Sequence, residues 1–345
     1  MGRSLTEVKS NDQIYGFDVL KMLMALCIVA IHVKPFEGNP ILSRCFSPLL
    51  SAAVPVFFIL SSFFLFRKLN SKSYDLNILL NWLKRIGTLY LFWLIVNLPF
   101  VIHDRLDRRG ESVITLVWYS IRDLFFASTF SGSWFLSALI FGVVFCYLIK
   151  KYLKANNVIF LSISVLVNIF LNYHSVCPTW VNGVYDWIAA NIHPEVELTV
   201  VSGILWCSIG CVLASDSCIH FLNRVKSYNN SILILILFVI LSWAMRIYIT
   251  DTLQSELRIG LSLSLYALFF CIKLPESSCY KTLRSFSILF YFQHFIWLHV
   301  YAWVFSSRFA VGGKYLIITA LCFIGASIIV GLSKKKYFKW LKYSY

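Results

Sequence analysis

The chain has 345 residues, of which 59% are hydrophobic and only 14% are charged, and its mean hydropathy is +0.74. Soluble proteins average about 45–50% apolar and about 25% charged residues, so this composition indicates a polytopic membrane protein. The net charge of +15 is typical of basic loops that orient membrane helices, and a nucleic-acid partner is excluded. We expect residues 1–345 to form a single membrane domain, so any chemistry lies among its helices.

Membrane-spanning helices need about 20 mostly apolar residues, and about 17–25 are tolerated. Ten segments meet this requirement: 17–33, 48–66, 86–103, 133–150, 157–173, 198–215, 230–250, 257–274, 286–305 and 314–332. They predict an all-α transmembrane bundle of about ten spans. The stretch 112–130 is also apolar, but Arg122 and Asp123 interrupt it, so we expect an amphipathic segment that lies at the interface or re-enters the membrane. An eleventh span is the alternative.

Lysine and arginine residues predict the orientation of this bundle, because cytoplasmic loops carry an excess of both. With the amino terminus inside, the inner segments hold 20 basic residues, Arg3 and Lys9 among them, and the outer segments hold 8, including Arg109 and Arg308. Both termini are therefore predicted to be cytoplasmic, in a multi-pass protein of the inner membrane. An eleventh span would invert half of the loops and remove this asymmetry.

The first predicted span, FDVLKMLMALCIVAIHV, contains Asp18, Lys21 and His32. A charge at the bilayer centre costs about 2.5–3.5 kcal/mol on insertion scales, so such residues are functional candidates. Asp18 and Lys21 are three residues apart and can pair on one helix face. Eleven residues turn a helix by about 1100°, so Lys21 and His32 share one stripe, about 16 Å apart. Snorkelling interfacial residues and an ordinary boundary histidine would give the same spacing.

The ninth predicted span lies in the sequence RSFSILFYFQHFIWLHVYAWVF and contains His294 and His299. Five residues separate the two by about 140° around a helix, so they cannot face one partner. His294 lies near mid-span, with Tyr291 on the adjacent turn and Ser287 two turns back. A histidine there needs a polar environment, either as a proton relay or as a packing residue with satisfied hydrogen bonds.

Three further arginines, Arg85, Arg246 and Arg258, lie at the edges of predicted spans or inside them. The planar guanidinium binds two oxygens at once and suits phosphate or carboxylate recognition, although these residues could also snorkel. Cys207 and Cys211 share a helix face without a nearby histidine or carboxylate, so no metal site is predicted. The motifs of soluble phosphate-binding, esterase and zinc-protease sites are absent from the sequence.

The first two predicted spans resemble the acyltransferase-3 family of integral membrane acyltransferases. Residues Lys21 to His32 are similar to the family's opening pattern, a basic residue, ten others and then His. The usual basic residue is Arg, and Lys keeps the charge but lacks the bidentate fork. The sequence VPVFFILSSFFL is similar to the family's Pro-x-Phe-Phe-x-x-Ser-Gly block, with Ser62 where Gly is expected.

Later spans continue this resemblance, in the expected order and over nearly the whole chain. The segment 85–90 resembles the family's basic, aromatic entry to the third span, and SWFLSAL, which contains Trp134, resembles its Trp-Phe-Leu block. Ser287, Tyr291 and His294 match a Ser-x-x-x-Tyr-x-x-His pattern. The resemblance implies transfer of an acyl group, most often acetyl from acetyl-CoA, onto a sugar hydroxyl of a surface glycan such as the O-antigen of lipopolysaccharide. Lipid-linked sugars are included among the expected acceptors.

Our mechanistic hypothesis connects the two ends of the first span. Lys21, helped by Arg85, would hold the CoA phosphates near the inner face, with Asp18 as the counter-ion of Lys21. His32 would act as general base on the acceptor hydroxyl, a role worth about 10²–10⁴-fold. An acyl-histidine relay is a second route. The other catalytic candidate and the expected supporting residues are His294, Ser287, Tyr291 and Trp134.

A secondary transporter is the alternative from another class of protein. In it, Asp18, Lys21, His32 and His294 would form a proton or solute path. The sequence shows no half-chain repeat and no paired spans broken by Gly or Pro, which many transporters have. An inactive component of a glycan-assembly complex is a third possibility.

Overall fold

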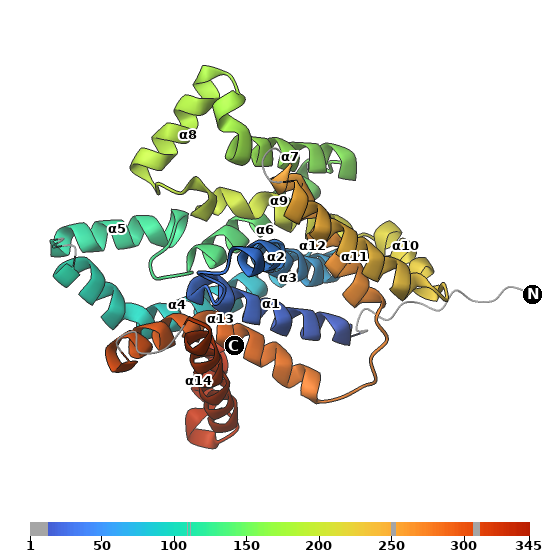
Figure 1. Cartoon of the computed structure of the whole chain (residues 1–345). Helices are drawn as coiled ribbons and strands as arrows, with labels where there is room; N and C mark the ends of the chain where they lie inside the picture. Colours follow the sequence, from blue (N-terminus) through green and yellow to red (C-terminus); the bar gives the residue numbers. More distant parts are fainter. Residues whose placement is uncertain (1–12, 109, 111, 250–252, 306–310) are drawn as a thin grey trace, which may run out of the picture.

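The computed structural model describes residues 13–108, 110, 112–249, 253–305 and 311–345, and the regular elements of this part of the chain are all helical (Figure 1). The α-helices are α1 Tyr15–Val33, α2 Pro40–Ser51, α3 Ala53–Asn70, α4 Leu76–Ile102, α5 Val113–Phe126, α6 Trp134–Tyr152, α7 Asn157–Tyr173, α8 Thr179–Asn191, α9 Gly203–Leu213, α10 Asp216–Ser227, α11 Ser231–Tyr248, α12 Gln254–Cys271, α13 Cys279–Phe305 and α14 Val311–Leu332. The predicted all-α fold is confirmed.

Every predicted span overlaps a helix, but the count of ten spans remains a prediction. Among the described residues, seven helical segments are long and apolar enough to cross a membrane, or eight if a bent pair is counted as one span. That pair joins Val200–Leu213 to α10 at an angle of 69°. The helices α12 and α13, which contain the eighth and ninth predicted spans, are not among the seven. Arg3, Lys9, Arg109 and Arg308, which enter the predicted charge asymmetry, lie outside the described residues.

The short helix α5 occupies the amphipathic stretch that was predicted at 112–130. Its 14 residues give a length of about 21 Å, which is less than the hydrocarbon thickness of about 30 Å. Asp123 is buried and pairs with both Arg105 and Arg122, at 2.7 Å in each case. The ion pair between Asp123 and Arg105 therefore holds α5 against the chain that follows α4.

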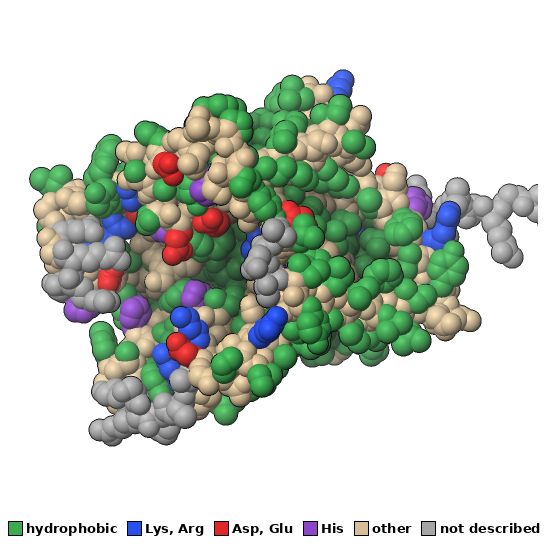
Figure 2. All heavy atoms as spheres, turned by 45° about the horizontal axis from the view of Figure 1, so that its top comes forward, with side chains coloured by type: hydrophobic (Ala, Val, Ile, Leu, Met, Phe, Trp, Pro, Cys, Tyr) green, Lys and Arg blue, Asp and Glu red, His purple; other side chains and the backbone are tan. Residues whose placement is uncertain are grey.

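Hydrophobic side chains cover much of the face shown in Figure 2, as expected for a chain surrounded by lipid. The helix α11 is an example, because Ser231 is the one buried residue among its 18. Leu233, Leu237 and Leu241 lie one turn apart and are all exposed. On a helix long and apolar enough to cross a membrane, such an exposed stripe is typical of a face in contact with lipid.

The helices α1, α3, α9 and α13 form the centre of the bundle (Figure 1), in which α1 packs against α3 and α13, and α9 packs against α3 and α6. Small residues allow the close approach. A Cβ on Gly142 of α6 would lie 2.8 Å from the carbonyl oxygen of Gly203 in α9, and close helix contacts of this kind are typical of membrane bundles. A Cβ on Gly210 would collide with the Ser62 hydroxyl, so Gly210 makes room for the serine at the position where the family pattern has Gly.

The end of the chain packs against the middle of α4. The indole Nε1 of Trp93 donates to the carbonyl oxygen of Ser344 at 3.0 Å, and the Trp93 ring stacks on Phe292 of α13 with centroids 5.3 Å apart. This contact links α4 to α13 at one level of the bundle. Along the α4 turns that precede Trp93, the two helices border a cavity.

Candidate functional site

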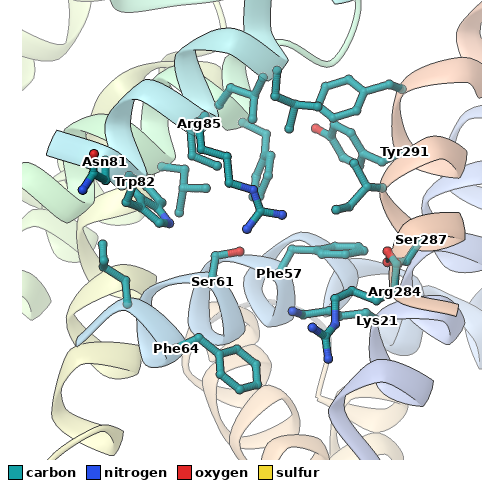
Figure 3. Close-up of a pocket in the computed structure, with 18 of the residues that line it drawn as sticks. Lys21, Phe57, Ser61, Phe64, Asn81, Trp82, Arg85, Arg284, Ser287 and Tyr291 are labelled. Carbon is teal, nitrogen blue, oxygen red and sulfur yellow. Dashed lines mark hydrogen bonds between the residues drawn. The ribbon is translucent and has the colours of Figure 1, made fainter. Parts of the chain in front are cut away.

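A cavity of about 500 Å³ lies among α1, α3, α4, α6 and α13 (Figure 3). The exposed residues Lys68 and Asn81, near the junction of α3 and α4, line it and mark its mouth. Phe17, near the start of α1, packs against Phe63 of α3 with ring centroids 5.7 Å apart. The mouth is therefore at the end of the bundle where α1 begins, the end that is predicted to face the cytoplasm.

Four cationic side chains line this cavity: Lys21, Lys68, Arg85 and Arg284. Figure 3 shows the Arg85 guanidinium pointing into the space from α4, with Lys21 and Arg284 on the other side of the cavity. Among the described residues, neither Lys21 nor Arg85 has an ion-pair partner. The positive charge of the lining is thus left unbalanced, and a ligand with several anionic groups would complement it.

Asp18 pairs with Arg284, not with Lys21 as the sequence predicted. Two nitrogens of Arg284, Nε and Nη2, donate to the Asp18 carboxylate at 2.8 and 2.9 Å, and Gln13 donates to it at 3.2 Å. The fork of an arginine on a neighbouring helix matches both carboxylate oxygens, which a lysine on the same helix cannot do. The Lys21 ammonium instead lies 4.8 Å from the Phe64 ring centroid, a cation–π contact.

Arg284 is a site residue that the sequence reasoning counted only as a loop charge. Arg284, Ser287 and Tyr291 follow the i, i+3, i+7 spacing of one helix face, and all three line the cavity. The Ser287 hydroxyl donates to the Arg284 carbonyl oxygen at 2.8 Å. The predicted motif of Ser287, Tyr291 and His294 could therefore have been extended by one turn toward the start of α13.

Three aromatic rings, Phe57 of α3, Phe135 of α6 and Tyr291 of α13, line the cavity and contact one another, and we call them the aromatic plug. Figure 3 shows Phe57 and Tyr291 away from Asn81 at the mouth. The Phe135 and Tyr291 centroids lie 5.2 Å apart, and Phe57 lies 6.1 Å from Tyr291 and 6.3 Å from Phe135. Packed aromatic pairs have centroids about 4.5–7 Å apart, so these rings are in contact. The cavity ends at the plug.

Next to the plug, His32 of α1 and His294 of α13 are brought together. Their rings stack with centroids 5.2 Å apart and an interplanar angle of 28°. His294 is 0% exposed, and its Nδ1 lies 3.0 Å from the Phe290 carbonyl oxygen, so Nδ1 carries the proton and donates. Its Nε2 is then a lone-pair acceptor, buried and without a hydrogen-bond partner in the described part of the chain. His32 is exposed at the carboxyl end of α1.

His299 faces a different partner, as its spacing from His294 predicted. Its ring stacks on Phe100 of α4 with centroids 4.9 Å apart. The two histidines of α13 therefore belong to separate surroundings, and only His294 meets His32. This contact also shows that the two predicted motifs, in the first and ninth spans, meet in space.

The predicted stripe from Lys21 to His32 is not an open path. Lys21 lines the cavity, whereas neither His32 nor His294 does. Ala25 and Ile28, which lie between Lys21 and His32 on the same helix face, are buried at 0% and 2% exposure. The side chains of α1 are packed into the bundle at mid-helix, so the cationic cavity and the histidine pair are separate compartments that adjoin at the plug.

Trp134 does not line the cavity, although the sequence assigned it a supporting role. Its ring packs on Phe58 with centroids 6.2 Å apart, and the lining residue is its neighbour Phe135. Phe58 in turn lies 4.6 Å from Phe135. Trp134 thus contacts the site only through the packing behind the aromatic plug.

A loop between α5 and α6 holds Tyr291 in place, and sequence reasoning missed it. The Tyr291 hydroxyl donates to the Gly132 carbonyl oxygen at 2.8 Å. Gly132 has a φ of +81°, and a Cβ there would lie 2.8 Å from a ring carbon of Phe295, so a larger residue would be strained. A hydrogen bond between the Thr129 and Tyr90 hydroxyls (3.1 Å) and one within the loop complete its anchoring. In the sequence, a glycine and several serines between two apolar segments were the features that could have predicted this loop.

The cationic cavity and the histidine pair can do different chemistry. The cavity can hold a polyanion by charge and hydrogen bonds, and the histidine pair offers a proton acceptor in an otherwise apolar setting. No group of three or more His, Cys, Asp or Glu side chains within the described ranges could hold a metal ion.

Comparisons with known proteins agree with the sequence motifs. A family model described as "Acyltransferase domain" matches residues 14–333. Two curated proteins from Enterococcus faecalis, each named "Amino-acid racemase", are 27% identical over 166 and 140 residues, which are 46% and 39% of this chain. The chain spans only 22% and 19% of those relatives. No solved structure matches it significantly. Because the family model covers nearly the whole sequence, this chain belongs to the acyltransferase-3 family of membrane acyltransferases.

Proposed function

We propose that this protein moves an acyl group, acetyl above all, from acyl-CoA in the cytoplasm to a sugar hydroxyl of an envelope or exported glycan. The observation that carries the proposal is the pairing of a cavity lined by four cations with a stacked histidine pair just beyond the cavity's closed end. The inner membrane is the proposed location, because the donor is made on one side of it and such glycans are exposed on the other.

The cationic cavity suits the phosphate groups of CoA. Arg85 projects into it, and among the described residues neither its guanidinium nor the Lys21 ammonium has an ion-pair partner. Arg284 is oriented by its bidentate contact with Asp18, which leaves other N–H groups free to bind a phosphate. Charge-assisted hydrogen bonds of this kind are about twice as strong as neutral ones. The mouth near Lys68 is then the proposed entrance of the donor.

The histidine pair is the proposed centre of the chemistry. His32 accepts the proton of the acceptor hydroxyl while the hydroxyl oxygen attacks the thioester carbonyl carbon. The new C–O bond forms, the C–S bond breaks, and the departing CoA thiolate takes up the proton that the imidazole received, so the products are an ester and a thiol. The Nε2 of His294, which has no hydrogen-bond partner in the described ranges, lies in the adjoining ring and offers a second acceptor for that proton.

A covalent route would use the same two rings. In it, a histidine nitrogen first attacks the thioester, and the acyl-imidazole is then attacked by the sugar hydroxyl. Ser287 and Tyr291 are proposed to support either route as walls of the donor cavity, and Trp134 by packing behind it.

The decisive experiment is mass spectrometry of the envelope glycan from the native host with and without the gene. We expect loss of an acetyl increment in the deletion strain and its return with the wild-type gene, but not with His32→Ala at a matched protein level. In isolated membranes, labelled acetyl-CoA should acylate the glycan fraction. An unchanged glycan and no donor-dependent product would refute the proposal, and donor-independent solute flux in proteoliposomes would favour the transporter instead.

A further inference from the structure

The aromatic plug lies where a thioester would have to pass. One side of its three rings borders the cationic cavity, and the Tyr291 centroid is 6.3 Å from the His294 ring beyond it. A donor whose phosphates are held by the cavity cations therefore reaches the plug before it reaches the histidine pair. Its carbonyl carbon can meet His32 or His294 only if the acyl group attached to that carbon passes between the rings.

Other phenylalanines of α3 show what ordinary packing looks like in this bundle. Phe58 and Phe63 are 1% and 0% exposed and do not line the cavity. Phe63 packs among Phe17 and Tyr266 in the bundle centre. Phe57, on the same helix, is instead in contact with the cavity. Phe57, Phe135 and Tyr291 are buried too, at 8%, 7% and 7% exposure, but they differ from Phe58 and Phe63 in lining the cavity, and Tyr291 approaches His294.

The three rings of the plug differ in how firmly they are held. Tyr291 is fixed by its hydrogen bond to Gly132, so its ring forms a rigid wall. Phe57 and Phe135 have no polar atoms, and van der Waals contacts alone hold them. A shift of either ring away from Tyr291 would open a gap against that fixed wall. Such a gap admits a short acyl group more readily than a long one.

We propose that Phe57 and Phe135 determine the acyl chain length that this protein transfers, with Tyr291 as the fixed wall of the passage. This inference rests on the proposed acyl transfer and adds the property that selects the donor. The wild-type protein then prefers acetyl-CoA to butyryl-CoA and hexanoyl-CoA. A pocket distinguishes chains that differ by one methylene by about 10–200-fold, so removal of a ring should relax the preference by roughly tenfold or more.

The test measures transfer from acetyl-, butyryl- and hexanoyl-CoA to the glycan fraction of native-host membranes that carry each variant. We expect Phe135→Ala and Phe57→Ala to raise the ratio of hexanoyl to acetyl transfer. The milder Phe135→Leu and Phe57→Leu should shift it in the same direction by a smaller factor, and they protect the test against poor folding of the alanine variants. Phe135→Trp should lower butyryl transfer relative to acetyl.

Phe63→Leu is the matched control, because it changes a buried phenylalanine of α3 that does not line the cavity. It should leave the ratio unchanged even if it lowers the protein level. A wild-type protein that transfers hexanoyl as well as acetyl, or plug variants that keep the wild-type ratio, would overturn the inference while leaving the acyltransferase function intact. Absence of transfer from all three donors by the wild-type protein would instead refute the proposed function itself.

Discussion

The cationic cavity and the histidine pair are neighbouring regions built on opposite physical principles. The cavity combines exposed residues such as Lys68 and Arg85 with open space of about 500 Å³. In the histidine pair, His294 is fully buried and His32 is exposed, and Phe295 packs within 4.5 Å of His32 and 4.1 Å of His294, measured between ring centroids. The solvated cavity lets charged ligands enter and leave, whereas the histidine pair places one exposed imidazole, open to an acceptor hydroxyl, beside a buried one. The comparison suggests that donor binding and chemistry are divided between the two.

Loss of His32 gives the largest expected effect and tests this division directly. We expect His32→Ala to lower kcat for acyl transfer by about 10²–10⁴-fold, because the general base is lost. The KM for acetyl-CoA should change little, since His32 does not line the cavity. Acetyl incorporation into the glycan fraction, at a range of donor concentrations and equal protein levels, measures both constants.

His299→Ala is the control for that experiment. It removes a histidine that stacks on Phe100 and does not contact His32. Near-normal transfer is expected for it. If His32→Ala also retained near-normal transfer, the histidine pair would have no part in the chemistry.

Substitution of Arg85 should change KM and not kcat, the converse of the result expected for His32. Hydrogen bonds to charged groups contribute about 1.5–3 kcal/mol, so Arg85→Ala should raise the KM for acetyl-CoA by roughly 10–100-fold. The kcat should stay near the wild-type value, because Arg85 lies in the cavity and the histidines do not. Arg85→Lys keeps the charge but lacks the planar fork, so its KM for acetyl-CoA should lie between those of the wild-type protein and Arg85→Ala. A fall in kcat with constant KM would contradict the division of roles.

Substitution of Lys21 should also raise the donor KM, but by less than substitution of Arg85. A lysine acts on phosphate as a point charge, so we expect Lys21→Ala to raise the donor KM by roughly tenfold. Lys21→Arg restores the basic residue usual in the family and should keep or improve donor affinity. Binding of labelled CoA to the purified protein in detergent measures this affinity, which should be highest with Arg at position 21, lower with Lys and lowest with Ala. Full affinity in Lys21→Ala would remove this residue from phosphate binding.

The two regions were also unequally predictable from the sequence. Apolar segment length identified helices throughout, and the eleven-residue spacing and the Tyr291–His294 motif each named a residue of the histidine pair, because these signals are local. The cavity depends on which helices become neighbours. Nothing in the sequence places Arg284 beside Asp18, or Phe57 beside Phe135, since those contacts join segments far apart in the chain.

The ion pair of Asp18 with Arg284 provides the smallest expected effect on transfer. Removing one partner of a buried ion pair is destabilising by about 3–5 kcal/mol. Arg284 is 41% exposed and can be solvated, so we expect Asp18→Asn to destabilise by less than that, about 1–2 kcal/mol. The donor KM should rise only a few-fold, because Arg284 loses its orientation but keeps its charge.

Thermal unfolding of the purified protein in detergent measures the stability term, and a double-mutant cycle isolates the pair. Asp18→Asn and Arg284→Gln should each lower the melting temperature. In the double variant the melting temperature should fall by less than the sum of the two single decreases. The Lys21→Gln variant serves as a comparison on the same helix, and combined with Asp18→Asn it should show weaker coupling than Arg284→Gln does, because Lys21 makes no direct ion pair with Asp18. Strong coupling between Asp18 and Lys21 would instead restore the pairing that their spacing predicted, and Arg284 would then be free to bind the donor alone.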